Sequence, residues 1–294
     1  MGSGSNNSYV NLLAALARAS TTKTPPPNDC GFGSALGSSV FRPIVPPPVP
    51  ATPPAPSKPD LDFIRKFVAD TARQKAEVKD GRVMPSIDDL AIMEGRRVNA
   101  AFVYSDLHGF TKLIATQPEN KSFVFLHTFV EVASRLTKFH EGQVVDCAGD
   151  RVLSVFHRSP GDHSHEPVRD AINFALYLQT AFDRVIGPAF ASGGLGQLSL
   201  GIGIDYGPAV VGCVGIRNGK KIVFLGEPAN RAAKLQEKAG ACETIWSFDV
   251  EYRKPSYLAA VNGWNIQPEL LGDNTLIYRT KCVYKDDLLL RIRG

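Results

Sequence analysis

Two β-type segments with turn residues at their centres constrain the fold of this chain most strongly. GQVVDCAGDRVLSVFH (residues 142–157) carries the turn AGD at 148–150, and LSLGIGIDYGPAVVGCVG (residues 198–215) carries YGP at 206–208. A tight turn joins antiparallel strands, whereas parallel strands need a long crossover connection. The sequence therefore predicts two β-hairpins and a largely antiparallel sheet.

Helical patterns are interspersed with these strands. Apolar residues recur at helical spacing in KSFVFLHTFVEVASRLTKFHE, RDAINFALYLQTAFDRVI and EPANRAAKLQEKA. Further β-rich runs are VNAAFVYS, KKIVFLG, ETIWSFDV and NTLIYRTKCVY. Intermixed helices and hairpins indicate an α+β fold, in which helices pack on the sheet.

The chain divides by composition into three parts. Residues 20–60 hold 12 of the 21 prolines, so we expect residues 1–60 to be a flexible, disordered Pro-rich tail. Residues 61–95 begin with the helical pattern LDFIRKFVADTARQKAEV and form a predicted helical lead-in. Residues 96–294 hold the strand patterns and the other helical patterns and form the predicted main domain.

Charge, cysteine content and hydropathy exclude several classes of protein. The net charge is +4 with dispersed Lys and Arg, which argues against a nucleic-acid binder. Five cysteines without a CxxC pair favour a reducing compartment. We see no secretory signal and no apolar stretch long enough to span a membrane, so we expect a cytoplasmic protein.

A possible metal site begins in FVYSDLHGFT (residues 102–111). Asp106 follows an apolar strand, and Asp150 lies in the AGD turn of the first hairpin. If the two strands are neighbours, both carboxylates reach one sheet edge and suit Mg²⁺ or Mn²⁺. The backbone N–H groups at Gly109 and Phe110, where a helix begins, suit a triphosphate. Two aspartates alone are also compatible with solvated turn residues.

Four fragments in a fixed order add a family resemblance over residues 96–240. FVYSDLHGFT, VVDCAGDRVLSVF, LGIGIDYGPAVVGCVG and FLGEPANRAAKL resemble, one after another, the motifs of the class III nucleotidyl cyclase catalytic domain. This resemblance implies that residues 96–294 are the catalytic domain. It implies a ferredoxin-like fold and head-to-tail homodimers with shared active sites. It also implies two Mg²⁺ or Mn²⁺ ions per site, held by Asp106, Asp150 and the carbonyl of Leu107, which act on a nucleoside triphosphate.

The resemblance further assigns one helix to the partner's active site. Family members carry an Asn that orients the ribose and, four residues on, an Arg that stabilises the α-phosphate charge. Here Asn230 matches, but Lys234 stands at the Arg position, which keeps the charge and loses bidentate geometry. Arg231 is a doubtful substitute. A further family Lys is replaced by Leu271, for which Arg279 or Lys281 could compensate.

The base-reading positions depart from both purine patterns. Asp146 and Val223 match neither the adenine nor the guanine readers of the family. Tyr104 stands where Phe is usual, and Arg151 stands where a small residue is common, which would shrink the pocket and offer donors to a pyrimidine oxygen. Core packing of Tyr104 and solvation of Arg151 or Lys234 are the simpler alternatives.

This combination resembles the pyrimidine cyclases of bacterial Pycsar anti-phage systems. It implies conversion of UTP, or of CTP, into a cyclic nucleotide that activates a separate effector. UTP is the first choice. A purine cyclase with an atypical pocket and an inactive cyclase-like nucleotide-binding module remain the alternatives.

Overall fold

The computed structural model describes residues 61–72, 74, 76–81, 84–85, 88–157, 166–216, 219–255 and 265–281. The predicted Pro-rich tail, residues 1–60, lies outside the described residues. The first part of the helical pattern after it forms α2 (Leu61–Ala72), whereas its last residues, Glu77 and Val78, lie in a strand. From Ala76 onward the described chain packs as a compact unit of its own.

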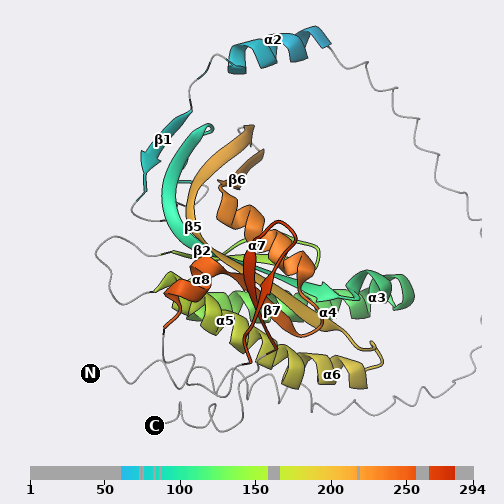
Figure 1. Ribbon diagram of the computed structural model, residues 1–294. Coiled ribbons are helices and arrows are strands. Elements are labelled where there is room, and N and C mark those ends of the chain that lie inside the picture. The colour runs from blue at the N-terminus through green and yellow to red at the C-terminus, as the bar shows by residue number, and fades with distance from the viewer. Residues whose placement is uncertain are drawn as a thin grey trace, which may run out of the picture. The chain divides into compact units, whose positions relative to one another are not determined.

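This second unit is built on one mixed sheet (Figure 1). Its strands are β1 (Glu77–Asp80), β2 (Glu94–His108), β3 (Gln143–Ala148), β4 (Arg151–His157), β5 (Ser199–Ile216), β6 (Gly219–Leu225), β7 (Glu243–Ser247), β8 (Gln267–Leu270) and β9 (Leu276–Thr280). They lie in the order β3-β4-β2-β5-β7-β9-β8, with β1 paired to β2 and β6 to β5. The pairs β1–β2 and β5–β7 are parallel and the others antiparallel. The predicted α+β fold with a largely antiparallel sheet is confirmed.

The helices of this unit connect and cover the strands. They are α3 (Phe110–Thr116), α4 (Glu119–Phe139), α5 (Pro167–Ala181), a π-helical turn η1 (Phe182–Ile186), α6 (Gly187–Ser192), α7 (Glu227–Lys238) and α8 (Phe248–Arg253). In the part of the chain that the structure describes, no helix is both long and apolar enough to cross a membrane.

The first predicted hairpin is confirmed. β3 and β4 pair antiparallel, with Ala148 opposite Arg151. Gly149 occupies the turn with φ of 64°, a left-handed conformation that glycine adopts without steric cost. The turn therefore carries Asp150 at the end of the sheet that faces the last residues of β2.

The prediction of a second hairpin with its turn at YGP is wrong. β5 runs without interruption from Ser199 to Ile216 and pairs with β2 along most of its length, so YGP lies inside a strand. At Gly207 a β-carbon would lie 2.8 Å from Cγ of Pro228 in α7. Glycine at this position permits the close approach of a helix to the strand. Glycine within a strand commonly marks such an approach, as well as bends and bulges. The true hairpin is β5–β6.

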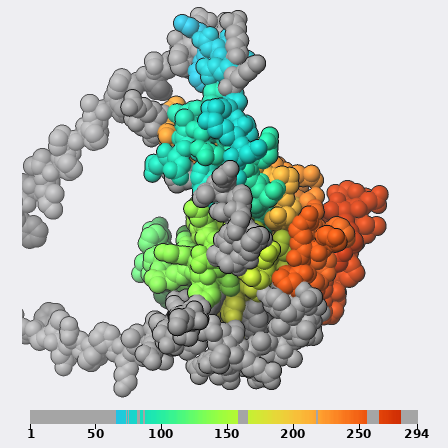
Figure 2. All heavy atoms as spheres, turned by 90° about the vertical axis from the view of Figure 1, so that its left-hand side faces the viewer, coloured from blue at the N-terminus to red at the C-terminus, as the bar shows by residue number. Residues whose placement is uncertain are grey.

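The two faces of the sheet have separate apolar cores. Ala101, Val103 and Leu107 of β2 pack with residues of α4 and α5 in the larger core. Ala100 and Phe102, which alternate with them, pack with Ala229 and Ala232 of α7 on the opposite face. Figure 2 shows the blue-to-teal residues of β1 and β2 beside the orange residues of β5 and β6, far apart in sequence. Tyr104 and Asp106 continue the series on the α7 face.

Candidate active site

Asp106 and Asp150 come together at the end of β2. The β2–β4 register places Ser105 opposite Val152, so the turn before β4 reaches Asp106. The pKa of Asp150 is raised above its usual range, mainly by burial and secondly by the negative charge of Asp106. The Leu107 backbone and the charge of Arg151 act in the opposite direction. The two carboxylates therefore repel each other in a partly desolvated place.

The donor set fits a hard divalent cation. Two neighbouring carboxylates offer oxygen ligands, and a dication between them would relieve their repulsion. Within the described ranges no group of three or more His, Cys, Asp or Glu side chains forms a candidate metal cluster. Further ligands to Asp106 and Asp150 would therefore come from the backbone, such as the predicted Leu107 carbonyl, from water or from a substrate.

Two other side chains contact Asp106. Arg151 Nε lies 3.9 Å from Oδ1 of Asp106, and its Nη2 lies 3.8 Å from Oε1 of Glu237. Gln236 Nε2 lies 3.4 Å from Oδ2 of Asp106. Sequence reasoning missed Gln236, although a signal existed: it is a polar residue on the apolar face of α7, beside Leu235 and one turn after Ala232.

Three residues predicted to bind the base lie in one group next to these carboxylates. Leu153 of β4 stands opposite Tyr104 on one side and Asp146 of β3 on the other. Burial raises the pKa of Tyr104, with the charge of Arg151 lowering it and that of Asp146 raising it. Tyr104 is half-buried, so its ring packs in the α7-side core while it remains near both charges.

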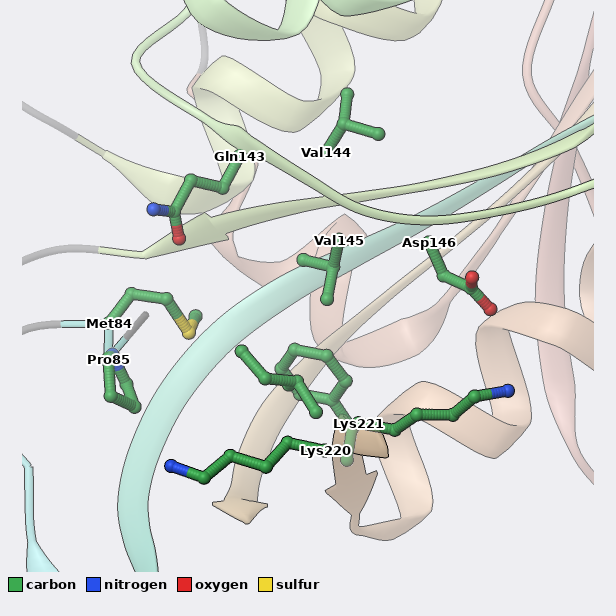
Figure 3. A pocket seen from close by; sticks show the side chains of 10 residues that line it. Met84, Pro85, Gln143, Val144, Val145, Asp146, Lys220 and Lys221 are labelled. Atoms are coloured by element: carbon green, nitrogen blue, oxygen red, sulfur yellow. The ribbon is translucent and has the colours of Figure 1, made fainter. Parts of the chain in front are cut away.

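A cavity of about 460 Å³ opens beside Asp146. Its walls are β3 and β6 with a segment before β2, and it is lined by Met84, Pro85, Gln143, Val144, Val145, Asp146, Lys220, Lys221, Ile222 and Phe224. The Lys221 side chain extends toward the Asp146 side of the cavity, whereas Lys220 extends the other way (Figure 3). Lys220 Nζ donates to the Leu90 carbonyl at 3.0 Å. The two lysines were not predicted as site residues.

Gly109 and Phe110 occupy the start of α3. Gly109 has φ of 91° and directs the chain from β2 into the helix. The Phe110 ring is buried and stacks on Phe125 with centroids 6.1 Å apart. Any contact of Phe110 with a triphosphate would therefore use its backbone, as the sequence prediction had it, and the side chain serves the core.

Asn230 and Lys234 are not brought to Asp106 within one chain. Both are exposed, while α7 packs on the sheet through residues that include Leu235 and Gln236. At about 100° per residue, Lys234 and Gln236 point about 200° apart around the helix. The residue that touches Asp106 and the pair assigned to the ribose and phosphate thus lie on different sides of α7.

Two candidate replacement cations are already engaged. Arg231 donates from Nε to the buried Asp205 at 2.5 Å and from Nη2 to Asp249 at 3.1 Å. Arg279 pairs with Glu269 and, at 2.8 Å, with Glu243.

The position of the missing family Lys holds an apolar contact instead. Leu271 packs against the small cluster that contains Leu235 and Ile245. Lys281 is exposed at the end of the described chain.

The comparisons with known proteins agree with this fold. The model of the "Adenylate and Guanylate cyclase catalytic domain" family matches residues 93–246. The chain therefore belongs to the class III nucleotide cyclases.

Two curated relatives and one solved structure are informative. A uridylate cyclase of Burkholderia cepacia is 30% identical over 69% of this chain and 87% of its own length. A uridylate cyclase of Gulbenkiania mobilis is 30% identical over 60% of this chain and 70% of its own. The adenylyl cyclase CyaB of P. aeruginosa superposes with a TM-score of 0.55 at 19% identity, covering 66% of this chain and 98% of that one, and supports the fold alone.

Proposed function

We propose that this cyclase is a pyrimidine nucleotide cyclase that converts UTP to the 3′,5′-cyclic nucleotide and pyrophosphate. The observation that carries the proposal is the grouping of Tyr104, Asp146 and Arg151 next to the Asp106–Asp150 pair. The uridylate cyclases among the relatives support the same substrate.

The reaction forms one bond and breaks another. The ribose 3′-oxygen loses its proton and attacks the α-phosphorus, while the bond from this phosphorus to the bridging oxygen breaks and releases pyrophosphate. Two Mn²⁺ or Mg²⁺ ions, when bound, would activate the 3′-oxygen and neutralise the phosphates. In this proposal Asp106, Asp150 and the Leu107 carbonyl hold the ions, and the Gly109–Phe110 backbone binds phosphate.

Asn230 and Lys234 act on the sugar and the phosphate. The Asn230 amide would orient the ribose, and the Lys234 ammonium would stabilise the charge that develops on the α-phosphate. Lys keeps this electrostatic role without the two parallel hydrogen bonds of an arginine.

Base selection rests on size and on hydrogen-bonding type. The Tyr104 ring and the Arg151 side chain take up space that a purine would need. Arg151 only donates, which suits a pyrimidine carbonyl oxygen, and an ionised Asp146 only accepts, which suits the N3–H of uracil. A cytosine amino group could also donate to Asp146, so CTP is the second candidate substrate.

A homodimer with shared sites would bring the two halves of the chemistry together. The separation of Asn230 and Lys234 from Asp106 within one chain supports this arrangement. Val214, Ile216 and Leu225 of the β5–β6 hairpin are 43%, 74% and 64% exposed, and a second copy could cover them.

The biological role follows from the resemblance. We propose that the product is a second messenger in anti-phage defence, acts on a separate effector, and is made in the cytoplasm. Phage challenge of cells carrying the wild-type gene or its Asp106→Ala form tests this role.

Two alternatives are favoured by specific departures. An inactive nucleotide-binding module fits Lys234 and Leu271, but the Asp106–Asp150 pair has no evident use there. Asp146 favours the second alternative, a purine cyclase, because its carboxyl resembles the acidic guanine reader of the family.

Incubation of the purified protein with each NTP and Mn²⁺ in turn, followed by mass spectrometry, distinguishes these alternatives. We expect cyclic UMP and no product from Asp106→Ala. A cyclic purine as main product would refute the pyrimidine assignment, and no product from any NTP would favour the binding module.

A further inference from the structure

Gln236 is a buried amide whose one hydrogen bond in the described structure ends on Asp106. The residue is 1% exposed on the sheet-facing side of α7. Its Nε2 lies 3.4 Å from Asp106 Oδ2, and its Oε1 is buried without a partner among the described residues. Buried amides normally satisfy both ends, so this incomplete bonding calls for an explanation.

The backbone of α7 fixes where this amide lies. A β-carbon at Gly203 of β5 would stand 2.2 Å from Gln236 N and 2.3 Å from the Ala232 carbonyl oxygen. The helix backbone therefore rests directly on the strand at this point. Gly203 stands opposite Tyr104 of β2. Asp106 is two residues further along β2 and on the same face of the sheet as Tyr104.

The charge of Asp106 determines which end of the amide faces it. An ionised carboxylate only accepts hydrogen bonds, so the NH₂ group must point to it and the oxygen must point elsewhere. The contact engages Oδ2 of Asp106, while Oδ1 faces Arg151. The amide thus restrains the rotation of the carboxylate through Oδ2 and leaves Oδ1 on the side of Arg151.

We propose that Gln236 is a positioning residue that orients the Asp106 carboxylate for metal binding. The inference rests on the proposed function, because it assumes that Asp106 is a metal ligand. Partners of this kind typically change metal affinity by about 10- to 100-fold when removed. Gln236 itself does not touch the substrate or the reacting atoms in this proposal.

A matched pair of variants separates positioning from stability. Gln236→Met keeps the length and volume of the side chain and removes the donor. Gln179→Met is the control, since Gln179 is also 1% exposed but donates to the carbonyls of Leu200 and Glu243. Gln236→Asn is a second test variant, which keeps an amide one methylene too short to reach Asp106.

The measurement is Mn²⁺ binding by the purified full chain without nucleotide, followed by the electron paramagnetic resonance signal of free Mn²⁺. We expect Gln236→Met and Gln236→Asn to bind about 10- to 100-fold more weakly than wild type, and Gln179→Met to bind like wild type even if its Tm falls. Wild-type affinity in both Gln236 variants, or an equal loss in Gln179→Met, would overturn the inference. If Asp106→Ala binds Mn²⁺ as well as wild type does, the proposed metal site is wrong and the inference fails with it.

Discussion

At the scale of single residues, Arg151 has the most specific predicted role. We expect Arg151→Ala to lower kcat/KM for UTP by about 10- to 100-fold, because a charged hydrogen bond to the base is lost. Arg151→Lys keeps the charge and should recover only part of the loss. Steady-state kinetics with UTP and ATP measure both effects, and an unchanged kcat/KM for UTP in Arg151→Ala would show that this side chain is merely solvated.

Asp150 provides a second test at this scale. Its pKa is raised by burial and by the charge of Asp106. The folded protein therefore holds a proton on Asp150 more tightly than the unfolded chain does. The ionised carboxylate therefore opposes folding as pH rises through the folded pKa, and at pH 7 without metal it is destabilising. We expect Asp150→Asn to raise Tm slightly in EDTA while abolishing turnover.

Thermal denaturation with and without Mn²⁺ checks the Asp150 prediction. Mn²⁺ should raise the Tm of wild type and leave that of Asp150→Asn unchanged, since ligand binding to the folded state alone is stabilising. A fall in Tm on Asp150→Asn in EDTA would mean that the carboxylates do not repel each other as described.

At the scale of elements, the contact between α7 and β5 determines the geometry of the site. Gly203→Ala would place a β-carbon 2.2 Å from a backbone atom of α7, so we expect a loss of about 1–3 kcal/mol in the free energy of unfolding. Gly212→Ala in the same strand is the control, because its β-carbon would meet nothing closer than 3.6 Å. Urea unfolding compares the two, and equal stability would show that α7 does not rest on Gly203.

The elements also show how far the sequence predicts the fold. The helices α4, α5 and α7 and the β3–β4 hairpin follow from apolar spacing and from Gly149. The prediction of a turn at YGP was wrong because glycine in such a pattern indicates either a turn or a close approach of another element. Only the tertiary packing of Gly207 against Pro228 decides between the two. The Gln236 contact depends on the depth at which α7 rests on the sheet, which one-dimensional periodicity does not contain.

At the scale of the whole molecule, the proposed shared site would require two chains. Asp106→Ala and Asn230→Ala should each be inactive as homodimers. Mixed and re-equilibrated in equal amounts, they should recover about a quarter of wild-type activity, because half of the dimers would carry one intact site of two. The control is the double variant, which carries both substitutions in one chain. Mixed with either single variant, it should stay inactive, because every chain in the mixture then lacks the same residue and no site is complete. No recovery on mixing the single variants would contradict shared sites.

The predicted site residues fall into two groups, those brought together within one chain and those that would need a second chain. Asp106, Asp150, Tyr104, Asp146 and Arg151 are brought together by strand register in one chain, as the motifs predict. The assignment of Asn230 and Lys234 depends on a second copy, so it stays a prediction.

This cyclase is proposed to select a pyrimidine, and direct competition among the four NTPs tests that selectivity best. An equimolar mixture of UTP, CTP, ATP and GTP is incubated with wild-type protein and Mn²⁺, and the cyclic products are quantified by mass spectrometry during the first few per cent of turnover. We predict that cyclic UMP dominates, with cyclic CMP second. Cyclic AMP or cyclic GMP as the main product would contradict the roles of Tyr104 and Arg151.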